Sequence, residues 1–444
     1  MFAKVLVANR GEIALRIIRA CRTLAIKTVA VYSEADAGAL HVAAADEAVP
    51  IGPAPARESY LHIERIIAAA RATGAEAIHP GYGFLSENWR FARACEEAGL
   101  CFVGPPWQVI QAMGEKTAAR RRMTEAGIPV LPGSDGAVRD LAEARAAAEA
   151  IGYPLMLKAA AGGGGIGLAP VATPDRLEAA FAQARRRVEA AFGDAALYLE
   201  RALEAPRHVE VQVLADRHGA VLHLHERDCS IQRRHQKLIE ESPAPGLLAG
   251  LRARLHEAGL RAARAAGYVS AGTVEFLLEG DRFYFLEMNT RLQVEHPVTE
   301  EVTGLDLVQA QLRIAAGEPL PWRQEEIPLR GAALECRIYA EDPDRNFLPS
   351  PGTITVLELP AGEGIRHECG VAAGSPVPVH YDPLLAKAIA WGPTRTEAIG
   401  RMARALEGYR LEGVKTTLPL HRRVMASRAF RAGKVHTRFL ERGH

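Results

Sequence analysis

The chain has 444 residues, of which 48% are hydrophobic, and a formal net charge of +1. This length allows two or three domains with a large core, and the balanced charge argues against a protein that binds nucleic acid or a membrane surface. The start of the sequence lacks the apolar core of a signal peptide, no apolar run is long enough to span a bilayer, and the six cysteines show no CxxC spacing. We therefore expect a cytoplasmic protein with reduced thiols and no disulfide or zinc framework.

The first hundred residues predict an open parallel sheet. A buried strand at residues 5–8, a helix from Gly11 and a second strand at residues 28–32 form a βαβ unit. Further helical patterns cover residues 60–71 and 87–98. The sequence after the first strand is not the G-x-G-x-x-G of a dinucleotide site, which argues against a nicotinamide dehydrogenase.

A glycine run dominates the next region. Residues 104–106 mark a boundary, Lys116 lies at the start of the next predicted helix, and a smaller lobe covers about residues 130–203. Four consecutive glycines follow a strand that ends at Lys158, namely Gly162, Gly163, Gly164 and Gly165. Glycines let backbone amides surround an anion and permit hinge motion, although a flexible linker is the alternative. The spacing lacks the Gly-Lys-Ser/Thr end of a Walker loop, so we favour a flap that covers phosphates.

Two polar segments come next. His208, Glu210 and Gln212 alternate with valines along a predicted strand, and residues 229–237 form a predicted short loop that is rich in hydrogen-bond donors and ends at Lys237. A solvated surface is the alternative explanation for both segments.

Residues 273–289 predict a β-hairpin that carries acids. A three-residue loop at residues 280–282 would pair Glu279 with Phe283 and place Glu275 opposite Glu287. Alternation along the second strand predicts one face with Tyr284, Leu286 and Met288, and another with Phe283, Phe285, Glu287 and Asn289. Two facing carboxylates repel each other, and carboxylate with amide oxygens suits Mg²⁺, so we favour a metal site over a solvated hairpin.

Further charged residues follow the hairpin. Arg291, Gln293, Glu295 and His296 continue an otherwise apolar segment. Arg337 lies on a later apolar strand and therefore needs an anionic partner. Arg291, at the same end of the hairpin as the two acids and Asn289, favours a combined metal and anion site.

The hairpin segment E-M-N-T-R-L-Q-V-E-H-P-V-T-E resembles the signature of the biotin carboxylase component of biotin-dependent carboxylases, which are ATP-grasp enzymes. The segments N-R-G-E-I-A-x-R, H-P-G-Y-G-F-L-S-E-N and F-L-P-S-P-G are also similar to that family. The resemblance covers the whole chain and implies a mixture of α/β and α+β structure. It implies an N-terminal open parallel α/β domain at residues 1–112, an ATP-grasp domain at 113–322 with a glycine-rich lid lobe at about 130–203, and a C-terminal mixed α/β domain at 331–444.

The same resemblance implies roles for individual residues. The residues expected to bind ATP are Lys116, Lys158, Gly162, Gly163, Gly164, Gly165, Glu200, Arg201, Leu203, His208, Gln232, His235, Glu275 and Glu287. Those expected to bind bicarbonate are Lys237, Arg291, Gln293, Val294 and Glu295, of which Lys237, Arg291 and Glu295 are also expected to be catalytic. Arg337 is the expected biotin-binding and catalytic arginine, and Glu275, Glu287 and Asn289 are the expected ligands of Mg²⁺ or Mn²⁺. The chain departs from the family at Ile166, where a cationic residue is usual.

The resemblance implies that the chain carboxylates biotin on a biotin carboxyl carrier protein, using ATP and bicarbonate, through carboxyphosphate. Acetyl-CoA carboxylase and fatty acid biosynthesis are the commonest setting. The alternatives are a component of another acyl-CoA, pyruvate or urea carboxylase, a related ATP-grasp carboxylate ligase, and a non-catalytic nucleotide sensor. The sequence has no A-M-K-M carrier motif, so we expect carrier and carboxyltransferase subunits as partners of a homodimer, and no nucleic acid or membrane partner.

Overall fold

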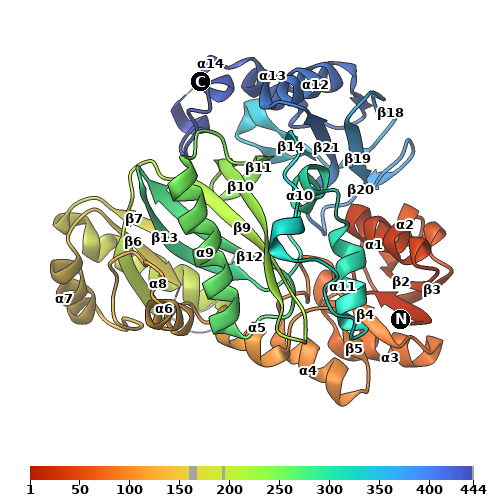
Figure 1. Cartoon of the computed structure of the whole chain (residues 1–444), viewed down its shortest axis with the longest axis horizontal. Coiled ribbons are helices and arrows are strands. Elements are labelled where there is room, and N and C mark those ends of the chain that lie inside the picture. The colour runs from red at the N-terminus through yellow and green to blue at the C-terminus, as the bar shows by residue number, and fades with distance from the viewer. Residues whose placement is uncertain (160–167, 193–195, 443–444) are drawn as a thin grey trace.

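The computed structural model describes residues 1–159, 168–192 and 196–442 (Figure 1). Its N-terminal part is an open parallel sheet with the strand order β3-β2-β1-β4-β5. The elements are β1 (Lys4–Val7), α1 (Gly11–Thr23), β2 (Lys27–Ser33), α2 (Leu40–Ala44), β3 (Glu47–Gly52), α3 (Ile63–Thr73), β4 (Ala77–His79), α4 (Trp89–Glu97) and β5 (Cys101–Phe102). The predicted βαβ unit is confirmed, and α1 buries Ile13 and Ile17 in the same core as Val5 and Val7.

An antiparallel sheet of eight strands forms the centre of the molecule, with the order β13-β12-β9-β10-β11-β14-β21-β19. The strands are β9 (Arg207–Ala215), β10 (Val221–Arg233), β11 (Gln236–Ser242), β12 (Ser270–Glu279), β13 (Arg282–Asn289), β14 (Ala332–Tyr339), β19 (Ile365–Cys369) and β21 (Leu384–Gly392). Because β11 pairs with β14, the sheet continues from the central region into the C-terminal region without a break.

A separate small lobe lies at one end of the molecule (Figure 1). It comprises α7 (Leu141–Ile151), β6 (Leu155–Ala159), β7 (Ala169–Val171), α8 (Leu177–Phe192) and β8 (Leu197–Arg201). The three strands form their own sheet over a core of their own. The predicted glycine flap, Gly162 to Gly165, and Ile166 lie outside the described residues.

The other elements cover the central sheet or extend the C-terminal region. They are α5 (Trp107–Gly114), α6 (Lys116–Glu125), α9 (Ala249–Ala266), α10 (His296–Thr303), α11 (Leu307–Ala315), β15 (Glu341–Asp342), β16 (Leu348–Pro349), β17 (Gly352–Thr353), β18 (Val356–Glu358), β20 (Pro376–Val377), α12 (Arg395–Gly408), β22 (Arg410–Glu412), α13 (Leu418–Ala426) and α14 (Arg428–Arg431). None of the described helices is long and apolar enough to cross a membrane.

The central sheet has one apolar and one polar face. Val209, Val211 and Val213 of β9 pack under α9. The alternating residues His208, Glu210 and Gln212 therefore point to the other face, where all three are buried rather than solvated. The polar face consequently needs internal partners for its charges.

The prediction of a loop at residues 229–237 was wrong. This segment forms the end of β10, a turn at Arg234 and His235, and the start of β11. Gln232 pairs with Lys237 across the turn, and both turn residues have positive φ angles of 49° and 70°. The polar side chains suggested a loop, but they face other parts of the protein while their backbone stays in the sheet.

Candidate active site

The β12–β13 hairpin brings Glu275 and Glu287 opposite each other, as predicted, but by a different route. The predicted three-residue loop was wrong, because Glu279 pairs with Arg282 and only residues 280–281 form the turn. A β-bulge at Leu286, between the pairs Phe276–Phe285 and Glu275–Glu287, restores the expected opposition.

The bulge also corrects the predicted faces of β13. Phe283, Phe285 and Met288 all lie in one core cluster, although Met288 was expected on the other face from the two phenylalanines. The extra residue inverts the alternation, so Glu287 and Asn289 point away from this core and toward the polar face.

Lys237 is the cationic centre of the polar face. Its Nζ lies 2.6 Å from Glu210 Oε2, 2.8 Å from Glu275 Oε1 and 2.7 Å from Glu295 Oε1. Burial alone would lower the pKa of Lys237, but these three carboxylates raise it well above its ordinary value. The ammonium group is therefore charged at any physiological pH and holds three acids that come from two strands and the turn after the hairpin.

Glu295 connects Lys237 to Arg337. Arg337 Nη2 donates to Glu295 Oε2 at 2.8 Å, and Arg337 Nε lies 2.6 Å from Glu240 Oε1. The anionic partners expected for Arg337 are thus Glu295 and Glu240. Burial favours the neutral acid, yet Lys237 and Arg337 hold the pKa of Glu295 well below its ordinary value. Glu295 is therefore an ionised carboxylate between two cations.

Arg291 joins the hairpin to the N-terminal region. Its Nε donates to Glu87 at 2.9 Å, Nη2 to Asn289 Oδ1 at 2.8 Å and Nη1 to Gln293 Oε1 at 3.0 Å. Gln293 in turn donates to Glu275 Oε1 at 3.2 Å. The predicted anion-site residues therefore lie within one hydrogen-bond network.

The two facing carboxylates differ in their partners. Glu275 accepts hydrogen bonds from Asn289 and Lys237, each at 2.8 Å, and its other oxygen lies 3.0 Å from His208 Nε2. Glu287 has no hydrogen bond or ion pair to any described residue. Burial, and then the charge of Glu275, raise the pKa of Glu287 above its ordinary value.

This donor set fits a divalent cation. A half-buried carboxylate without a partner among the described residues, beside a second carboxylate and an amide, gives hard oxygen ligands of the kind that Mg²⁺ prefers. The Asn289 oxygen accepts a hydrogen bond from Arg291, and its second lone pair remains for a metal.

Several residues expected at ATP interact with one another or with the acid pair. Lys158 forms an ion pair with Glu200. Burial lowers the pKa of Lys116, and the negative charge of Glu287 counteracts part of this decrease. Gln232 Nε2 lies 3.5 Å from His208 Nδ1. Burial and the nearby Lys158 lower the pKa of His235.

Arg201 and Leu203 are not brought to the carboxylates by any described side-chain contact. Arg201 uses its backbone N–H to reach Pro132 O at 2.8 Å. Their expected role, contact with adenine through the backbone, would not need such a contact.

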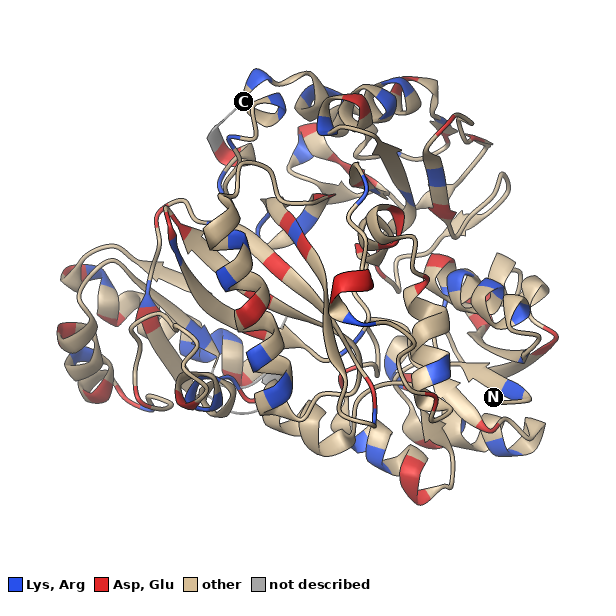
Figure 2. Ribbon diagram, in the orientation of Figure 1, with Lys and Arg blue, Asp and Glu red and all other residues tan. Residues whose placement is uncertain are grey.

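Three buried residues of the network were missed from the sequence. Arg227 donates to Glu210 and Gln212, Glu240 pairs with Arg337, and Lys387 Nζ donates to the carbonyl of Val294 at 2.8 Å. Glu87 was also missed, although it lies in the quoted segment H-P-G-Y-G-F-L-S-E-N. Figure 2 shows both signs of charge on the central strands, a pattern that is unusual for a buried sheet.

Comparisons with known proteins cover the entire chain. Residues 1–110 match the family described as "Biotin carboxylase, N-terminal domain", residues 115–323 match "Carbamoyl-phosphate synthase L chain, ATP binding domain", and residues 335–442 match "Biotin carboxylase C-terminal domain". The biotin carboxylase of Halalkalibacterium halodurans is 56% identical over 441 residues, which are 99% of this chain and 97% of that protein.

The chain belongs to the biotin carboxylase family.

Other biotin carboxylase relatives serve different carboxylases. A pyruvate carboxylase component of Methanothermobacter thermautotrophicus is 53% identical, over 99% of this chain and 90% of that protein. The biotin carboxylase domain dimer of Hydrogenobacter thermophilus 2-oxoglutarate carboxylase, solved with MgADP, ADP and bicarbonate, matches with a TM-score of 0.97 and 50% identity. That match covers 100% of this chain and 98% of that chain. The expected fold of an ATP-grasp biotin carboxylase is confirmed.

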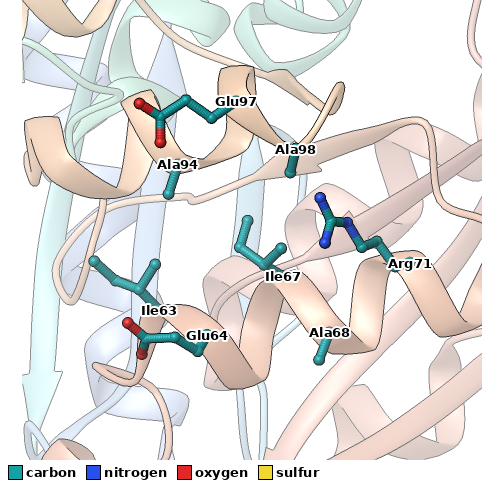
Figure 3. Close-up of a pocket in the computed structure, with 8 residues that line it drawn as sticks. All are labelled: Ile63, Glu64, Ile67, Ala68, Arg71, Ala94, Glu97 and Ala98. Atoms are coloured by element: carbon teal, nitrogen blue, oxygen red, sulfur yellow. The ribbon is translucent and has the colours of Figure 1, made fainter.

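A shallow groove lies elsewhere on this biotin carboxylase, between α3 and α4 (Figure 3). Ile63, Ile67 and Ala68 line one side, and Ala94 and Ala98 line the other. None of its lining residues belongs to the carboxylate network, so the groove plays no part in the site described here.

Proposed function

We propose that this chain catalyses the ATP-dependent carboxylation of biotin carried on a biotin carboxyl carrier protein, with bicarbonate as the source of the carboxyl group. One observation carries the proposal: Glu295 bridges Lys237, the proposed bicarbonate ligand, and Arg337, the proposed biotin ligand. Because one carboxylate contacts both cations, this arrangement supports a single site in which bicarbonate is activated and biotin is carboxylated.

Bicarbonate would bind beside Lys237, Arg291, Gln293 and the backbone of Val294. These groups lie around Glu275 and Glu295 and provide hydrogen-bond donors to an anion. Glu295 would accept the bicarbonate proton, and its depressed pKa means that it is already ionised. A bound anion would compete for Lys237 and Arg337, which would increase the basicity of Glu295 at the moment when it is needed.

ATP would bind to Lys116, Lys158, His208, Gln232 and His235, with further contacts to Glu200, Arg201 and Leu203. Gly162 to Gly165 lie outside the described residues and are proposed ATP ligands from the sequence alone. Glu275, Glu287 and Asn289 would hold Mg²⁺ or Mn²⁺, which offsets negative charge on the transferred phosphoryl group. Attack of a bicarbonate oxygen on the γ-phosphorus releases ADP and gives carboxyphosphate. Lys237 and Arg291 would hold this anion until its C–O bond breaks to give CO₂ and phosphate. The phosphate would take the proton of the biotin ureido nitrogen, which would then attack the CO₂.

Arg337 would stabilise the enolate that forms when the biotin ureido nitrogen loses its proton. Its position on β14, beside the bicarbonate residues of β11 and the hairpin, supports this role. Donors aimed at developing charge contribute roughly 10²- to 10³-fold in rate.

The cellular setting that we favour is acetyl-CoA carboxylase and fatty acid biosynthesis in the cytoplasm. Carrier and carboxyltransferase subunits would be the partners of a homodimer. Relatives from pyruvate and 2-oxoglutarate carboxylases have the same architecture, so a component of another carboxylase is the alternative setting.

The decisive experiment measures ADP release by the purified chain with Mg²⁺ and ATP, with and without bicarbonate and free biotin. We expect ADP release that requires bicarbonate, and labelled carboxybiotin when ¹⁴C-bicarbonate and biotin are present. Glu287→Gln is the matched control for contaminating ATPases. ADP release without bicarbonate, stimulated instead by another carboxylate, would support the ligase alternative, and no ADP release would support the non-catalytic alternative.

A further inference from the structure

Three histidines form a compact cluster on the opposite side of the central sheet from the carboxylate network. His223 and His225 belong to β10, and His256 belongs to α9, which covers the apolar face. The rings of His223 and His256 stack with centroids 4.0 Å apart, and the His225 ring lies 5.5 Å from His223 and 5.7 Å from His256. One ligand nitrogen from each residue can be chosen so that all lie within 4.8 Å of one another.

In two of these rings, Nε2 already has a hydrogen-bond partner. His256 Nε2 lies 2.6 Å from Glu226 Oε2, and His225 Nε2 lies 3.1 Å from the carbonyl of Pro328. Imidazoles that bind metals generally donate their second N–H to a carboxylate or a backbone carbonyl, which fixes the tautomer and orients the ring. In His256 this arrangement leaves Nδ1 with a free lone pair.

Glu226 is itself held as an anion. Its Oε1 accepts from Arg252 Nε at 2.8 Å and from the backbone N–H of Ala244 at 3.2 Å. Its side chain is fully buried. The carboxylate behind His256 is therefore oriented independently of the histidine.

The backbone at the cluster is irregular. A bulge interrupts the β9–β10 register between His223 and Glu226, and His225 has a φ of 65°, which is uncommon for a residue other than glycine. Gln324 clamps the bulge, because it accepts from the backbone N–H of His223 at 2.9 Å and donates to its carbonyl at 3.0 Å. Strain of this kind, supported by its surroundings, is typical of binding sites.

We propose that His223, His225 and His256 form a transition-metal site, for Zn²⁺ in particular, that links β10, α9 and the segment 324–328. Imidazole ligands suit Zn²⁺, and three protein ligands leave a fourth position for water. His223 and His225 are half-buried, so the site is accessible to an ion, whereas His256 is buried. Ligand nitrogens around tetrahedral Zn²⁺ lie about 3.3 Å apart, so side-chain rotations would bring the rings to the ion.

The described contacts of the three histidines do not reach the carboxylate network, so the role that we assign to the ion is structural. Sequence patterns did not single out the site, because His256 is distant in the chain from His223 and His225, and the set shows no zinc-finger spacing. The ion would fix the segment 324–328, which leads into β14 and so to Arg337.

The test measures metal binding by the metal-stripped full chain in a Glu287→Gln background, which weakens the separate acidic site. Titration with Zn²⁺, and with Co²⁺ as a spectroscopic probe, should reveal one site per chain with the visible absorption of a tetrahedral complex. His256→Gln keeps a donor to Glu226, and His225→Asn keeps a residue that tolerates positive φ. Each should weaken Zn²⁺ binding roughly 100-fold, while the exposed His380→Gln should not change it.

Stability gives a second readout that does not depend on activity. Zn²⁺ should raise the melting temperature of the parent chain but not that of His225→Asn, since only a ligand of the folded state stabilises it. Circular dichroism of the metal-free variants shows whether they fold. Stoichiometric binding that survives both substitutions, or weak binding without the Co²⁺ absorption, would overturn the proposal and identify the cluster as a stacked imidazole core.

Discussion

Glu275 and Glu287 face each other across one hairpin, but their surroundings differ. Substitution of each residue should therefore affect the stability of the protein differently. Glu275 is bound by Lys237, Asn289 and Gln293, whereas Glu287 has no partner among the described residues and is repelled by Glu275. Charge at Glu287 therefore costs stability in the metal-free protein, a common property of functional carboxylates.

Glu287→Gln should leave the free energy of unfolding unchanged or raise it by about 1 kcal/mol, because it removes a repulsion. It should lower bicarbonate-dependent ADP release at least 100-fold. Glu275→Gln should also inactivate the protein, but it should lower the free energy of unfolding by about 3 kcal/mol, because Lys237 and His208 lose a buried partner. Urea denaturation without Mg²⁺ makes the comparison, and equal stability losses would contradict the assignment.

Arg337 should separate the two halves of the proposed reaction. Arg337→Ala should lower biotin carboxylation roughly 10²- to 10³-fold and largely keep bicarbonate-dependent ADP release. Both rates are measured in one preparation, and an equal loss of both would place Arg337 in the ATP site.

A double variant controls for structural damage by this substitution. Arg337→Ala leaves Glu240 without its cation, and burial already raises the pKa of Glu240 to about 7. Arg337→Ala/Glu240→Gln removes that unpaired carboxylate, so it should recover stability without recovering carboxylation. Recovered carboxylation would make Arg337 a structural residue only.

At the level of helices and strands, the sequence allowed prediction of features that depend on residues close together in the chain. The first βαβ unit follows from periodicity and was confirmed. The predicted opposition of Glu275 and Glu287 is also present, but it depends on a shorter turn and a bulge that were not predicted. The bulge at Leu286 and the continuation of β10 through Gln232 could not be predicted, because they depend on packing and pairing with distant strands. The buried ion pairs of Glu240 and Arg227 were missed for the same reason, since their partners are remote in the chain.

The contact between α9 and β9 gives a prediction about one glycine. A Cβ at Gly259 would lie 2.7 Å from Val211 Cγ1, so Gly259→Ala forces the helix and sheet apart. Overpacking typically costs about 1–3 kcal/mol, which outweighs the gain in helix propensity of about 1 kcal/mol. Gly250→Ala in the same helix has open space around its Cβ and should be neutral or slightly stabilising. Thermal unfolding of the two variants tests the packing, and a stable Gly259→Ala would contradict it.

At the level of the whole molecule, buried histidines should make stability fall in mild acid. Burial lowers the pKa of His421 to about 4, of His41 to about 4 and of His79 to about 3. In the unfolded chain these histidines bind a proton near pH 6.5, whereas in the folded protein they stay neutral to lower pH. The free energy of unfolding is therefore highest above pH 6.5 and decreases as the pH falls toward the pKa of the folded state.

His421→Gln should isolate one of these protons. His421 Nε2 lies 2.7 Å from the carbonyl of Arg337, a bond that Gln can also donate. Between pH 7 and pH 5 the parent should lose about 2 kcal/mol more stability than the variant. Urea denaturation at the two pH values measures this difference, and parallel losses would show that His421 is protonated in the folded state.

The unbroken eight-stranded sheet limits how relatives could exchange their C-terminal regions. In a chimera joined between α11 and β14, the new β14 must pair with β11 so that Glu335 faces Glu240. A slip by one residue would turn Arg337 to the opposite face of the sheet and away from Glu295. Whether such a chimera folds correctly therefore depends on the register between β11 and β14. A segment exchanged between relatives would have to include both of these strands.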